Sequence, residues 1–583
     1  MPPVAPRHDG RGLRNGHFAI APQIHTDEVI ARGVQLDEIH VRKYSFRFVD
    51  DGYTWRVFCY IILMPNYFPN CSVLIGAGIL SFSTLHLTAQ VDVYDARLPL
   101  PVLFLHGMSG DASSWGEMAT LLSNEAGLTE GQELRYCLNG DGSDGSSTLD
   151  EVLPFTALTA GHADFFRINF ECNASGTCWS NSASNSDGIF SGQAAAAKQG
   201  LAVADAVAEI LDATGAPEIV LVGHSMGGLA AREYLQNPEY WPVDEQGIAH
   251  HRVAKLVTSG TPHNGSNFSV GWLEDLGDLF GFDIEQRSDA VRDLRTSYYY
   301  SGDPGVFLFG GLEDNWVLWD FLFQNFWNVD VNCNGNTGDN IVGLNQKTLA
   351  DDLEFAFITS YDDGIVSAFS SDAVTTMYNP THRERFFVNG VFHTSMNDEL
   401  GLTLQGMDEP DDIATAYPIS SGQTIMGFSS PQGTDAPYPT EDRDVYALEV
   451  LEHSIATLDT LWFGSDLIEA IWLDEQGGFL GDALSADGVS LEAGIAHLRI
   501  TTMPTGAVTN HLFAAEFTPA PAPCPEDLDN SGLITASDVL LALSQFGCSA
   551  DEVPEGCSSD VDGDGIVGVN DILAVLSMFG SPC

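Results

Sequence analysis

Basic residues are scarce in this chain. Lys and Arg together number 23 against 81 Asp and Glu, which gives a formal net charge of −58 at pH 7. A surface of this sign repels polyanions, so nucleic acids are excluded as partners and anionic lipid headgroups are disfavoured. Hard cations need carboxylate oxygens, so part of the acidity is available for metal binding. The remainder is expected to form a solvated surface.

Charged residues of both signs make up only 18% of the 583 residues, whereas hydrophobic residues make up 44%. This composition argues against wholesale disorder and predicts well-buried cores. At about 100–200 residues per domain, the length predicts several domains.

The sequence also lacks an uninterrupted apolar run long enough to cross a membrane. The best candidate, residues 72–87, is short and contains Ser and Thr, so no stable transmembrane span is expected. The run follows Met64 and leads into Leu87-Thr88-Ala89, which is typical of a signal peptide. Residues 64–89 are therefore predicted to be a signal peptide, and the mature protein to be secreted or held at the cell surface. Residues 1–63, which hold 8 of the 23 Lys and Arg, are interpreted as the product of a misplaced start codon.

No Cys-x-x-Cys pair is present, so a zinc or redox site of that kind is not expected. Cleavage after Ala89 leaves eight cysteines, an even number that predicts disulfides in an exported protein. Cys172 and Cys178 are close enough to close a small loop, and the last four cysteines lie in one short C-terminal module. The sequence leaves the pairing open.

Residues 90–408 alternate apolar runs with helical patterns, which predicts an α/β fold with a mostly parallel sheet and helices on both faces. The predicted strands share short, continuous apolar sequences and are 101–105, 218–222, 253–258 and 354–359. The Ala-rich stretch 193–213 has apolar residues at helical spacing and is predicted to be a helix.

The strongest chemical signal follows this helix. Residues 218–230 read EIVLVGHSMGGLA, a buried strand, then the G-x-S-x-G motif around Ser225, then a helix start. The turn between strand and helix is so tight that bulk at either flanking position would collide with backbone, which explains both glycines. The turn holds the Ser225 hydroxyl clear of the sheet, close to the free N–H groups of the next helix. Ser225 is the predicted nucleophile.

Two further segments strengthen a family resemblance. GHSMGGLAAREYL, LVTSGTPHNGS (256–266) and PVLFLHGMSGDASSW (101–115) resemble α/β-hydrolase lipases, including bacterial triacylglycerol lipases and GPI-inositol-deacylase-like esterases. The resemblance implies an oxyanion hole made by the N–H groups of Met108 and Met226, which would stabilise the charge of a tetrahedral intermediate. It also implies that His106 shapes a loop, with a role as the catalytic base as the alternative.

A serine nucleophile needs a base, and the base needs an orienting carboxylate. The fold supplies them in the order Ser, Asp or Glu, His. Asp363, before Gly364 at the end of a predicted strand, matches the position of the acid, with Asp362 as the rival. His393 follows the last strand and is the predicted base, with His382 as the weaker candidate.

Residues 271–345 are too many for a simple connection between strands and carry many aromatic side chains. They are predicted either to form a helical insertion with its own core or to cap Ser225 and shape an acyl-chain pocket. The insertion ends in DVNCNGNTGDN. There Asp330, Asn332, Asn334 and Asp339 either bind one Ca²⁺ or form an Asn/Gly turn, because no acid stands at the twelfth position.

The pattern changes near residue 409. Residues 410–517 contain short alternating runs between Gly, Asp and Pro turns, which predicts an all-β sandwich. DRDVYALEV and LEAGIAHLRI resemble bacterial pre-peptidase C-terminal domains, which are accessory modules without catalytic function. Residues 518–524 form a Pro-rich linker, which is expected to be extended.

The C-terminal module, residues 525–583, contains two related segments, DLDNSGLITASD and DVDGDGIVGVND, that lie 33 residues apart. Each has oxygen ligands at positions 1, 3, 5 and 12 and Gly at position 6, as a calcium loop requires, and each precedes a helical pattern. The predicted ligands are Asp527, Asp529, Ser531, Leu533 (through its carbonyl) and Asp538 in the first loop, with Thr535 as a further candidate, and Asp560, Asp562, Asp564, Ile566 (through its carbonyl) and Asp571 in the second. With Asp at position 12 and one helix per loop, the module resembles type I dockerins. That resemblance implies a cohesin-like partner or a cell-surface anchor.

Together these features predict a secreted, multidomain serine hydrolase that cleaves carboxylic esters, with lipids or other acyl esters as substrates. The alternatives are an amidase, depolymerase or acyltransferase that uses the same three residues, because fold alone does not select among them. A calcium-dependent adhesion or scaffold protein with an inactive hydrolase domain is the alternative from another class.

Overall fold

Short, apolar segments from the first half of the chain and from residues 354–388 form an eight-stranded sheet. The strand order is β12-β11-β8-β7-β3-β6-β4-β5, and all neighbours are parallel except β4 and β5. The strands are β3 (Val102–Leu105), β4 (Leu134–Cys137), β5 (Leu153–Pro154), β6 (Phe165–Asn169), β7 (Ile219–His224), β8 (Val253–Ser259), β11 (Glu354–Ser360) and β12 (Arg383–Val388). We call this part of the protein the sheet domain.

The computed structural model describes the chain in part. The described residues are 40–50, 53–63, 96–138, 149–154, 156, 158, 163–170, 191–244, 247–266, 288–294, 306–313, 330–350, 353–372, 383–429, 442–463, 466–503, 509–520, 524–529, 531–549 and 557–581. The predicted signal peptide, residues 64–89, lies outside them.

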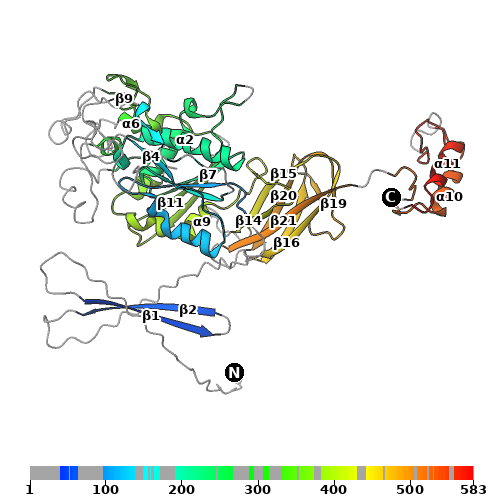
Figure 1. Ribbon diagram of the computed structural model, residues 1–583, viewed down its shortest axis with the longest axis horizontal. Coiled ribbons are helices and arrows are strands. Elements are labelled where there is room, and N and C mark those ends of the chain that lie inside the picture. The colour runs from blue at the N-terminus through cyan, green and yellow to red at the C-terminus, as the bar shows by residue number, and fades with distance from the viewer. Residues whose placement is uncertain are drawn as a thin grey trace, which may run out of the picture. The chain divides into compact units, whose positions relative to one another are not determined.

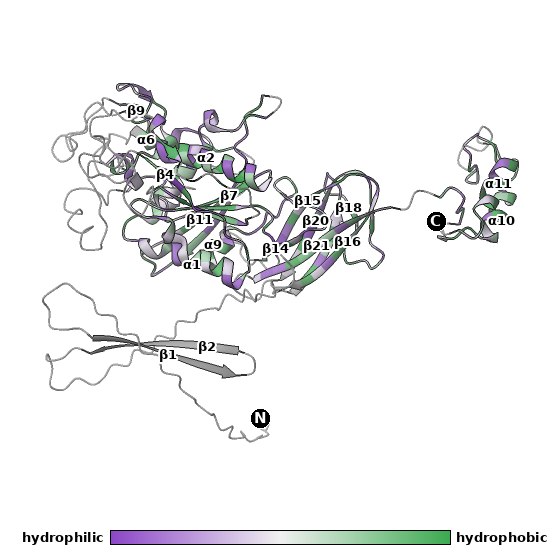
Figure 2. Ribbon diagram, in the orientation of Figure 1, coloured by the Kyte–Doolittle hydropathy of each residue, from purple (hydrophilic) through white to green (hydrophobic). Residues whose placement is uncertain are grey.

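Helices cover both faces of the sheet because alternate strand residues point to opposite sides. Leu103 and Leu105 pack into the cluster that includes α2 (Ala196–Thr214) and α3 (Met226–Leu235). Phe104 belongs to a second cluster with α1 (Gly116–Thr120) and α9 (Leu400–Gly406). Figure 1 shows α2 and α9 on opposite sides of the strands, and Figure 2 shows hydrophobic residues along α2. The strands predicted at 101–105, 218–222, 253–258 and 354–359 are confirmed to within two residues.

Three strands of the sheet, β4, β5 and β6, were not predicted. β4 and β6 have only four and five residues, and β6 carries Arg167 in its middle. The Arg167 guanidinium donates to the carbonyl oxygen of Ala112 at 2.8 Å, so the charge is accommodated at the edge of a loop. Short strands with an internal charge lack the continuous apolar pattern on which prediction relies.

The following region is rich in β-structure and consists of two sheets, with strand orders β13-β15-β20-β17-β18 and β14-β21-β16-β19. We call it the β-rich region. Its strands are β13 (Tyr417–Pro418), β14 (Thr424–Ser429), β15 (Asp442–Val450), β16 (Ser454–Phe463), β17 (Asp466–Leu473), β18 (Phe479–Asp482), β19 (Val489–Leu491), β20 (Gly494–Met503) and β21 (Thr509–Pro519). Side chains from both sheets, including Tyr446 and Phe513, belong to one buried cluster. The resemblance to pre-peptidase C-terminal domains stays a prediction.

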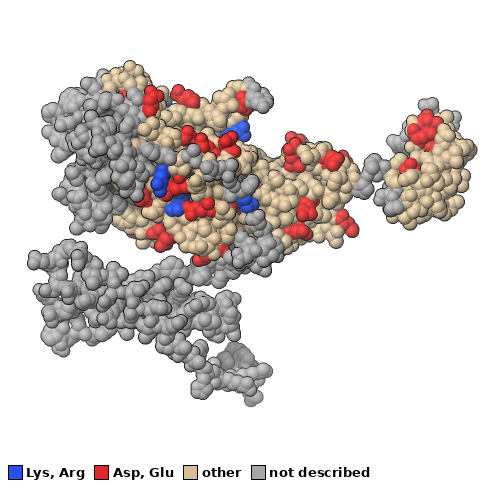
Figure 3. Space-filling view, viewed as in Figure 1, with Lys and Arg blue, Asp and Glu red and all other residues tan. Residues whose placement is uncertain are grey.

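The C-terminal segment contains α10 (Ala536–Ser544) and α11 (Val569–Ser577) around a small core of Ile534, Ala542 and Val575. A disulfide joins Cys548 to Cys557. Figure 3 shows acidic residues grouped on this segment. Near the N-terminus, a separate hairpin pairs β1 (His40–Asp50) with β2 (Tyr53–Leu63).

The cysteines depart from the predicted even set of disulfides in one respect. Cys333 is a free thiol with 1% of its surface exposed. Cys137 and Cys524 are each disulfide-bonded, whereas Cys172 and Cys178 lie outside the described residues. Burial raises the pKa of the Cys333 thiol well above its usual range, so it is held protonated in the interior.

Among the described residues, no helix is both long and apolar enough to span a membrane.

Candidate active site

Ser225 sits at the sharp turn between β7 and α3. Its backbone has φ 51° and ψ −127°, a conformation that a residue with a side chain rarely adopts. The turn is close-packed, because a Cβ added to Gly223 would lie 2.6 Å from the Cα of Gly228. A Cβ added to Gly227 would lie 2.6 Å from the carbonyl oxygen of His106. The two glycines of the motif are thus required by the geometry of the turn itself.

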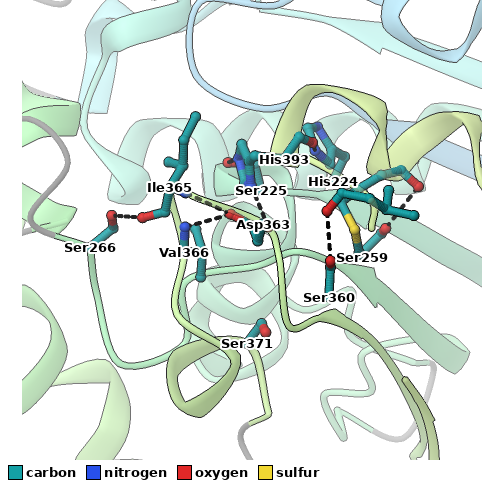
Figure 4. A network of polar contacts seen from close by, with 12 residues as sticks. His224, Ser225, Ser259, Ser266, Ser360, Asp363, Ile365, Val366, Ser371 and His393 are labelled. Carbon is teal, nitrogen blue, oxygen red and sulfur yellow. Dashed lines mark hydrogen bonds and ion pairs between the residues drawn. The ribbon is translucent and has the colours of Figure 1, made fainter. Parts of the chain in front are cut away.

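Three side chains from separate elements meet at this turn, as Figure 4 shows. Nε2 of His393 lies 2.8 Å from Oγ of Ser225, and Nδ1 of the same ring lies 2.8 Å from Oδ2 of Asp363. Asp363 is 2% exposed and His393 is 6% exposed. The imidazole therefore bridges the hydroxyl and the carboxylate in a site that is mostly shielded from water. This arrangement suits removal of the hydroxyl proton by His393 while Asp363 orients the ring.

The Asp363 carboxylate is itself held in place. Its Oδ1 accepts hydrogen bonds from the N–H groups of Ile365 at 3.0 Å and Val366 at 2.6 Å. The carbonyl oxygen of Asp363 accepts from the N–H of His393 at 2.9 Å. One carboxylate oxygen is thus committed to the backbone and the other faces the imidazole.

The rival residues have other positions. Oδ2 of Asp362 accepts from the N–H of Gly390 at 2.7 Å, which ties the end of β11 to the turn after β12. His382 lies outside the described residues. Nε2 of His106 accepts from the N–H of Phe170 at 3.0 Å, so its Nδ1 carries the proton and donates to the carbonyl of Gly107 at 2.8 Å. Burial lowers the pKa of His106 to about 4, and the residue acts as a neutral link between loops.

His224, directly before Ser225, contacts the backbone of His393 and helps to hold it in place. Its Nε2–H donates to the carbonyl oxygen of His393 at 2.9 Å, and the two rings lie 4.9 Å apart. Burial, reinforced by the neighbouring His393, lowers the pKa of His224 to about 3, so its ring is neutral at ordinary pH. The role of His224 as an anchor for the His393 backbone depends on residues 169 positions apart.

The predicted oxyanion-hole residues flank the nucleophile. A Cβ added to Gly107 would lie 2.7 Å from Cβ of Ser225, so the loop that carries Met108 passes directly over the serine. Met226 is the first residue of α3. Within the described part of the chain, neither the Met108 nor the Met226 N–H donates a hydrogen bond to a protein atom. Both donors are therefore available to a substrate oxygen.

An apolar cluster adjoins these two residues. The buried Met226 and the half-buried Met108 pack with side chains of α5 (Asp289–Leu294) and α6 (Val306–Phe309), which belong to the predicted cap. Phe307 and Phe309 are the two described cap aromatics in this cluster. The remaining cap aromatics, such as Trp272 and Trp316, lie outside the described residues.

The cap is attached to the sheet domain by buried charges that were not predicted from the sequence. The Arg292 guanidinium binds Asp289 at 2.9 Å and Asp293 at 2.8 Å. Oδ2 of Asp293 also accepts from the N–H of Ala196 at the start of α2, at 2.9 Å. An Asp-x-x-Arg-Asp run is typical of an exposed helical face, and only the packing of α5 on α2 reveals its burial.

The candidate calcium loop of the cap is closed by its own hydrogen bonds. Asp330 accepts from the N–H groups of Asn334 and Gly335, and the Asn334 amide donates to Asp339 at 2.6 Å. Asn332 accepts from the same Asn334 N–H at 3.2 Å. The structure brings the four predicted residues into one turn, which is compatible with both hypotheses.

The two C-terminal loops bring most of the predicted ligands together. Carboxylate oxygens of Asp527, Asp529 and Asp538 lie within 4.8 Å of one another, as do those of Asp560, Asp562 and Asp564. Oγ of Ser531 donates to the Leu533 carbonyl at 3.1 Å, so these oxygens also face one another. Asp571 accepts from the N–H groups of Val561, Asp562 and Gly568, which fixes the second loop around it. This set of hard oxygen donors fits Ca²⁺.

Comparison with known proteins agrees with the sheet topology. Residues 99–274, which include β3, β7, β8 and Ser225, match the family described as PGAP1-like alpha/beta domain. The sheet domain has the α/β-hydrolase fold. The sharp turn at Ser225, at the carboxyl end of a central strand, is where this fold carries its nucleophile.

Relatives resemble the hydrolase domain over a short stretch. A triacylglycerol lipase of Pseudarthrobacter phenanthrenivorans is 41% identical over 63 residues, which is 11% of this chain and 16% of the relative. A triacylglycerol lipase of Burkholderia plantarii is also 41% identical over 63 residues, or 14% of its length. The chain therefore spans about a sixth of the first relative.

Solved structures resemble the chain more broadly but at low identity. The Bacillus licheniformis lipase BlEst2 in propeptide form is 13% identical, with 73% of this chain and 76% of that chain covered and a TM-score of 0.28. The product of the Listeria innocua gene lin2722 is 17% identical, with 54% and 95% covered and a TM-score of 0.30. Likenesses of this degree carry no weight for function.

Proposed function

We propose that the protein is a serine-dependent hydrolase of carboxylic esters. The observation that carries this proposal is the pair of 2.8 Å contacts that link Ser225, His393 and Asp363 at a strained turn. A buried serine, histidine and aspartate that serve only stability would not need a backbone conformation costing about 1–3 kcal/mol. Strain of this kind persists where it positions a reacting group.

The reaction follows from the geometry. Oγ of Ser225 attacks the ester carbonyl carbon while Nε2 of His393 takes its proton, and the carbonyl oxygen becomes an oxyanion between the Met108 and Met226 N–H groups. His393 then gives its proton to the leaving alcohol, which leaves an acyl group on Ser225. Water, deprotonated by His393, attacks the acyl-enzyme and releases the acid. Asp363 stabilises the positive charge of His393 throughout.

The substrate class is inferred from the surroundings of the oxyanion hole. Met108, Met226 and Phe307 belong to one apolar cluster beside the nucleophile. Apolar walls favour an acyl chain over a small polar acid. The triacylglycerol lipases that match the domain are consistent with lipid or other acyl-ester substrates.

We further propose that the protein is exported, that its C-terminal loops bind Ca²⁺, and that this module attaches to a cohesin-like protein or a cell-surface anchor. Two separated acidic oxygen clusters and the Cys548–Cys557 disulfide support the proposal of an extracellular calcium module. Catalysis itself needs no cofactor in this scheme.

The proposal is tested by measuring release of p-nitrophenol from butyrate and palmitate esters in calcium buffer. The native chain is expected to hydrolyse both, with the butyrate-to-palmitate ratio separating esterase from lipase preference. Ser225→Ala is expected to lose at least about 10³-fold in kcat, because the nucleophile is gone. Ser266→Ala is the matched control, since its hydroxyl donates to the Ile365 carbonyl at 2.6 Å and lies outside the reacting atoms.

A fluorophosphonate label separates this proposal from an inactive scaffold. Only a serine activated by a base reacts, so labelling should occur in the native chain and disappear in Ser225→Ala. Folded native protein that neither labels nor cleaves either ester would refute the hydrolase proposal. Labelling without ester cleavage would favour an amidase, depolymerase or acyltransferase.

A further inference from the structure

Four carboxylates are buried where the sheet domain meets the β-rich region. Asp408 and Glu409 follow α9, and Asp442 and Asp444 begin β15. Their exposed fractions are 4%, 4%, 1% and 0%. Figure 3 shows other acidic residues at the surface, whereas these four are in the interior. We call them the junction cluster.

The cluster concentrates negative charge. Single carboxylate oxygens of Asp408, Glu409 and Asp444 lie within 4.8 Å of one another. Burying even one ionised carboxylate without compensation costs several kcal/mol, and like charges at this distance add to that cost. The interior must therefore supply either protons or a cation.

Asp444 is the member with the least support from the protein. Neither of its oxygens has a hydrogen-bond partner among the described residues, although the side chain is fully buried. The nearest basic atom is Nε2 of His511, at 3.8 Å from Oδ2. That nitrogen lies 3.1 Å from the Tyr446 hydroxyl, and Nδ1 of the same ring lies 3.1 Å from Oγ of Ser429. Both ring nitrogens therefore have nearer partners than Asp444.

The lysine beside the cluster is shared with other carboxylates. Nζ of Lys255 donates to the main-chain carbonyl of Asp408 at 2.7 Å. It also pairs with Glu384 at 3.2 Å and Glu354 at 3.6 Å, on β12 and β11. Two carboxylates already share its single charge, so Lys255 holds Asp408 in place without neutralising the cluster.

A neutral oxygen lies beside the acids. The register of β15 and β20 places Thr502 directly opposite Asp442, so the two side chains lie on the same face of the sheet. Thr502 is 0% exposed, and its hydroxyl has no hydrogen-bond partner within the described residues. A buried hydroxyl left without a partner destabilises the fold unless something else occupies its lone pair. The Thr502 hydroxyl is an observation independent of the carboxylates that points to a ligand beside them.

We propose that the junction cluster is a Ca²⁺ site, with Asp408, Glu409 and Asp444 as ligands and Asp442 and Thr502 adding oxygens. Ca²⁺ takes 6–8 oxygens at about 2.3–2.6 Å, so ligand oxygens lie up to about 5 Å apart, and the three carboxylate oxygens all lie within 4.8 Å of one another. Mg²⁺ keeps several waters and demands a tighter octahedron, and Zn²⁺ prefers nitrogen and sulfur.

A cavity adjoins the proposed site. It has a volume of about 140 Å³ and is lined by Lys255, Glu409, Asp411 and Asp412, among others. Its lining shares Glu409 with the proposed site, so open space lies next to one of the ligands. The acidic lining also attracts cations.

The site ties two parts of the protein together. Asp408 follows α9, whose Gly406 packs on Val257 and Ala356 of the hydrolase sheet, so that a Cβ there would lie 2.7 Å from the Val257 side chain. Asp442 and Asp444 belong to the β-rich region. A bound ion would therefore stabilise both parts at once, and this calcium site is distinct from the C-terminal loops.

The test uses the full chain with both C-terminal loops disabled by Asp527→Ala and Asp560→Ala, and with the candidate calcium loop of the cap disabled by Asp339→Ala. Bound calcium is counted by atomic emission after dialysis in calcium buffer, and Tm is measured with calcium and with chelator. Adding Asp444→Asn is expected to remove one Ca²⁺ per chain and to abolish the calcium-dependent rise in Tm. Asp459→Asn, an exposed acid on β16, is the matched control and should change neither value.

Thr502→Val provides a milder variant in case Asp444→Asn does not fold. It keeps all four carboxylates, and we expect its calcium affinity, measured by calorimetry, to be weaker by about tenfold. Equal calcium content in Asp444→Asn and Asp459→Asn would overturn the proposal. So would a Tm of the loop-disabled chain that calcium leaves unchanged, because the carboxylates would then be protonated instead.

Discussion

Replacing Asp363 by Asn tests how the active site controls the tautomer of His393. In the native protein, Oδ1 of Asp363 accepts from the N–H groups of Ile365 and Val366, and Oδ2 accepts from Nδ1–H of His393. An asparagine must keep its oxygen toward the two N–H groups, so its NH₂ would face Nδ1. The imidazole would then accept at Nδ1 and carry its proton on Nε2, where it cannot take the Ser225 proton.

The expected loss of activity is large because the proton would occupy Nε2 of His393, the atom that must act as the base. Holding a catalytic histidine in the wrong tautomer costs about 10⁴-fold in kcat. This factor corresponds to about 5.5 kcal/mol at about 1.36 kcal/mol per tenfold. KM should change little, since Asp363 does not belong to the apolar cluster of described residues that forms the proposed acyl pocket. The assay is steady-state hydrolysis of p-nitrophenyl butyrate at pH 8, with folding checked by circular dichroism.

Asp362→Asn is the matched control. Its carboxylate accepts only the Gly390 N–H among its described contacts within 3 Å, and an asparagine oxygen can replace it there. We expect kcat within about twofold of the native value, because no reacting atom is touched. A loss below tenfold in Asp363→Asn, or equal losses in the two variants, would refute the assignment of Asp363 as the orienting acid.

Three further predictions concern the loop over Ser225, the buried histidines and the C-terminal loops. Gly107→Ala places a Cβ 2.7 Å from Cβ of Ser225. We expect kcat to fall by about 10²-fold or more in a folded protein, because the nucleophile would be displaced. Normal turnover would contradict the close approach of this loop. The pKa values of His106 and His224, lowered by burial to about 4 and about 3, lie below the unfolded value of about 6.5, so the unfolded state binds more protons between these limits. The free energy of unfolding should therefore fall as pH drops from about 6.5 toward 4, by up to about 3 kcal/mol for His106. His106→Asn should flatten the pH dependence of this free energy, measured by urea unfolding. If the variant shows the same pH dependence as the native protein, the His106 ring is not a neutral buried group. Removing calcium should unfold the C-terminal helices, which would be measured as a loss of helical circular dichroism. Asp560→Ala should reproduce part of that loss. Full helicity in chelator would contradict calcium-dependent folding of the loops.

Local sequence was sufficient where one short segment defines a structure. The run from Ile219 to Leu235 contains a buried strand, a glycine-flanked serine and a helix, and each is recognisable from neighbouring residues alone. The same holds for the two calcium-type loops, whose oxygen positions repeat in a fixed order. β4 and β6 were missed because four or five residues with internal charge carry too little pattern.

Residues that are distant in sequence required the tertiary structure. The cysteine count suggested an even set of disulfides, yet Cys333 is a buried free thiol, since its position in the fold leaves it without a bond. Arg292 pairs with two aspartates of its own helix, and one of them, Asp293, anchors the cap on α2; no local pattern indicates that these charges are buried. The junction cluster was not foreseen at all, because two of its members follow α9 and the other two begin β15.

The sequence by itself pointed to Ser225 as the candidate nucleophile, to the order of the candidate acid and base, to four strands of the central sheet and to the calcium-type loops. These depend on backbone geometry and spacing within a few contiguous residues. Only the tertiary structure decided that His393 faces Ser225, that Asp363 rather than Asp362 faces His393, and that His224 holds the His393 backbone. Those contacts join residues 30 to 169 positions apart, and their distances are set by the packing of separate strands and not by any local pattern.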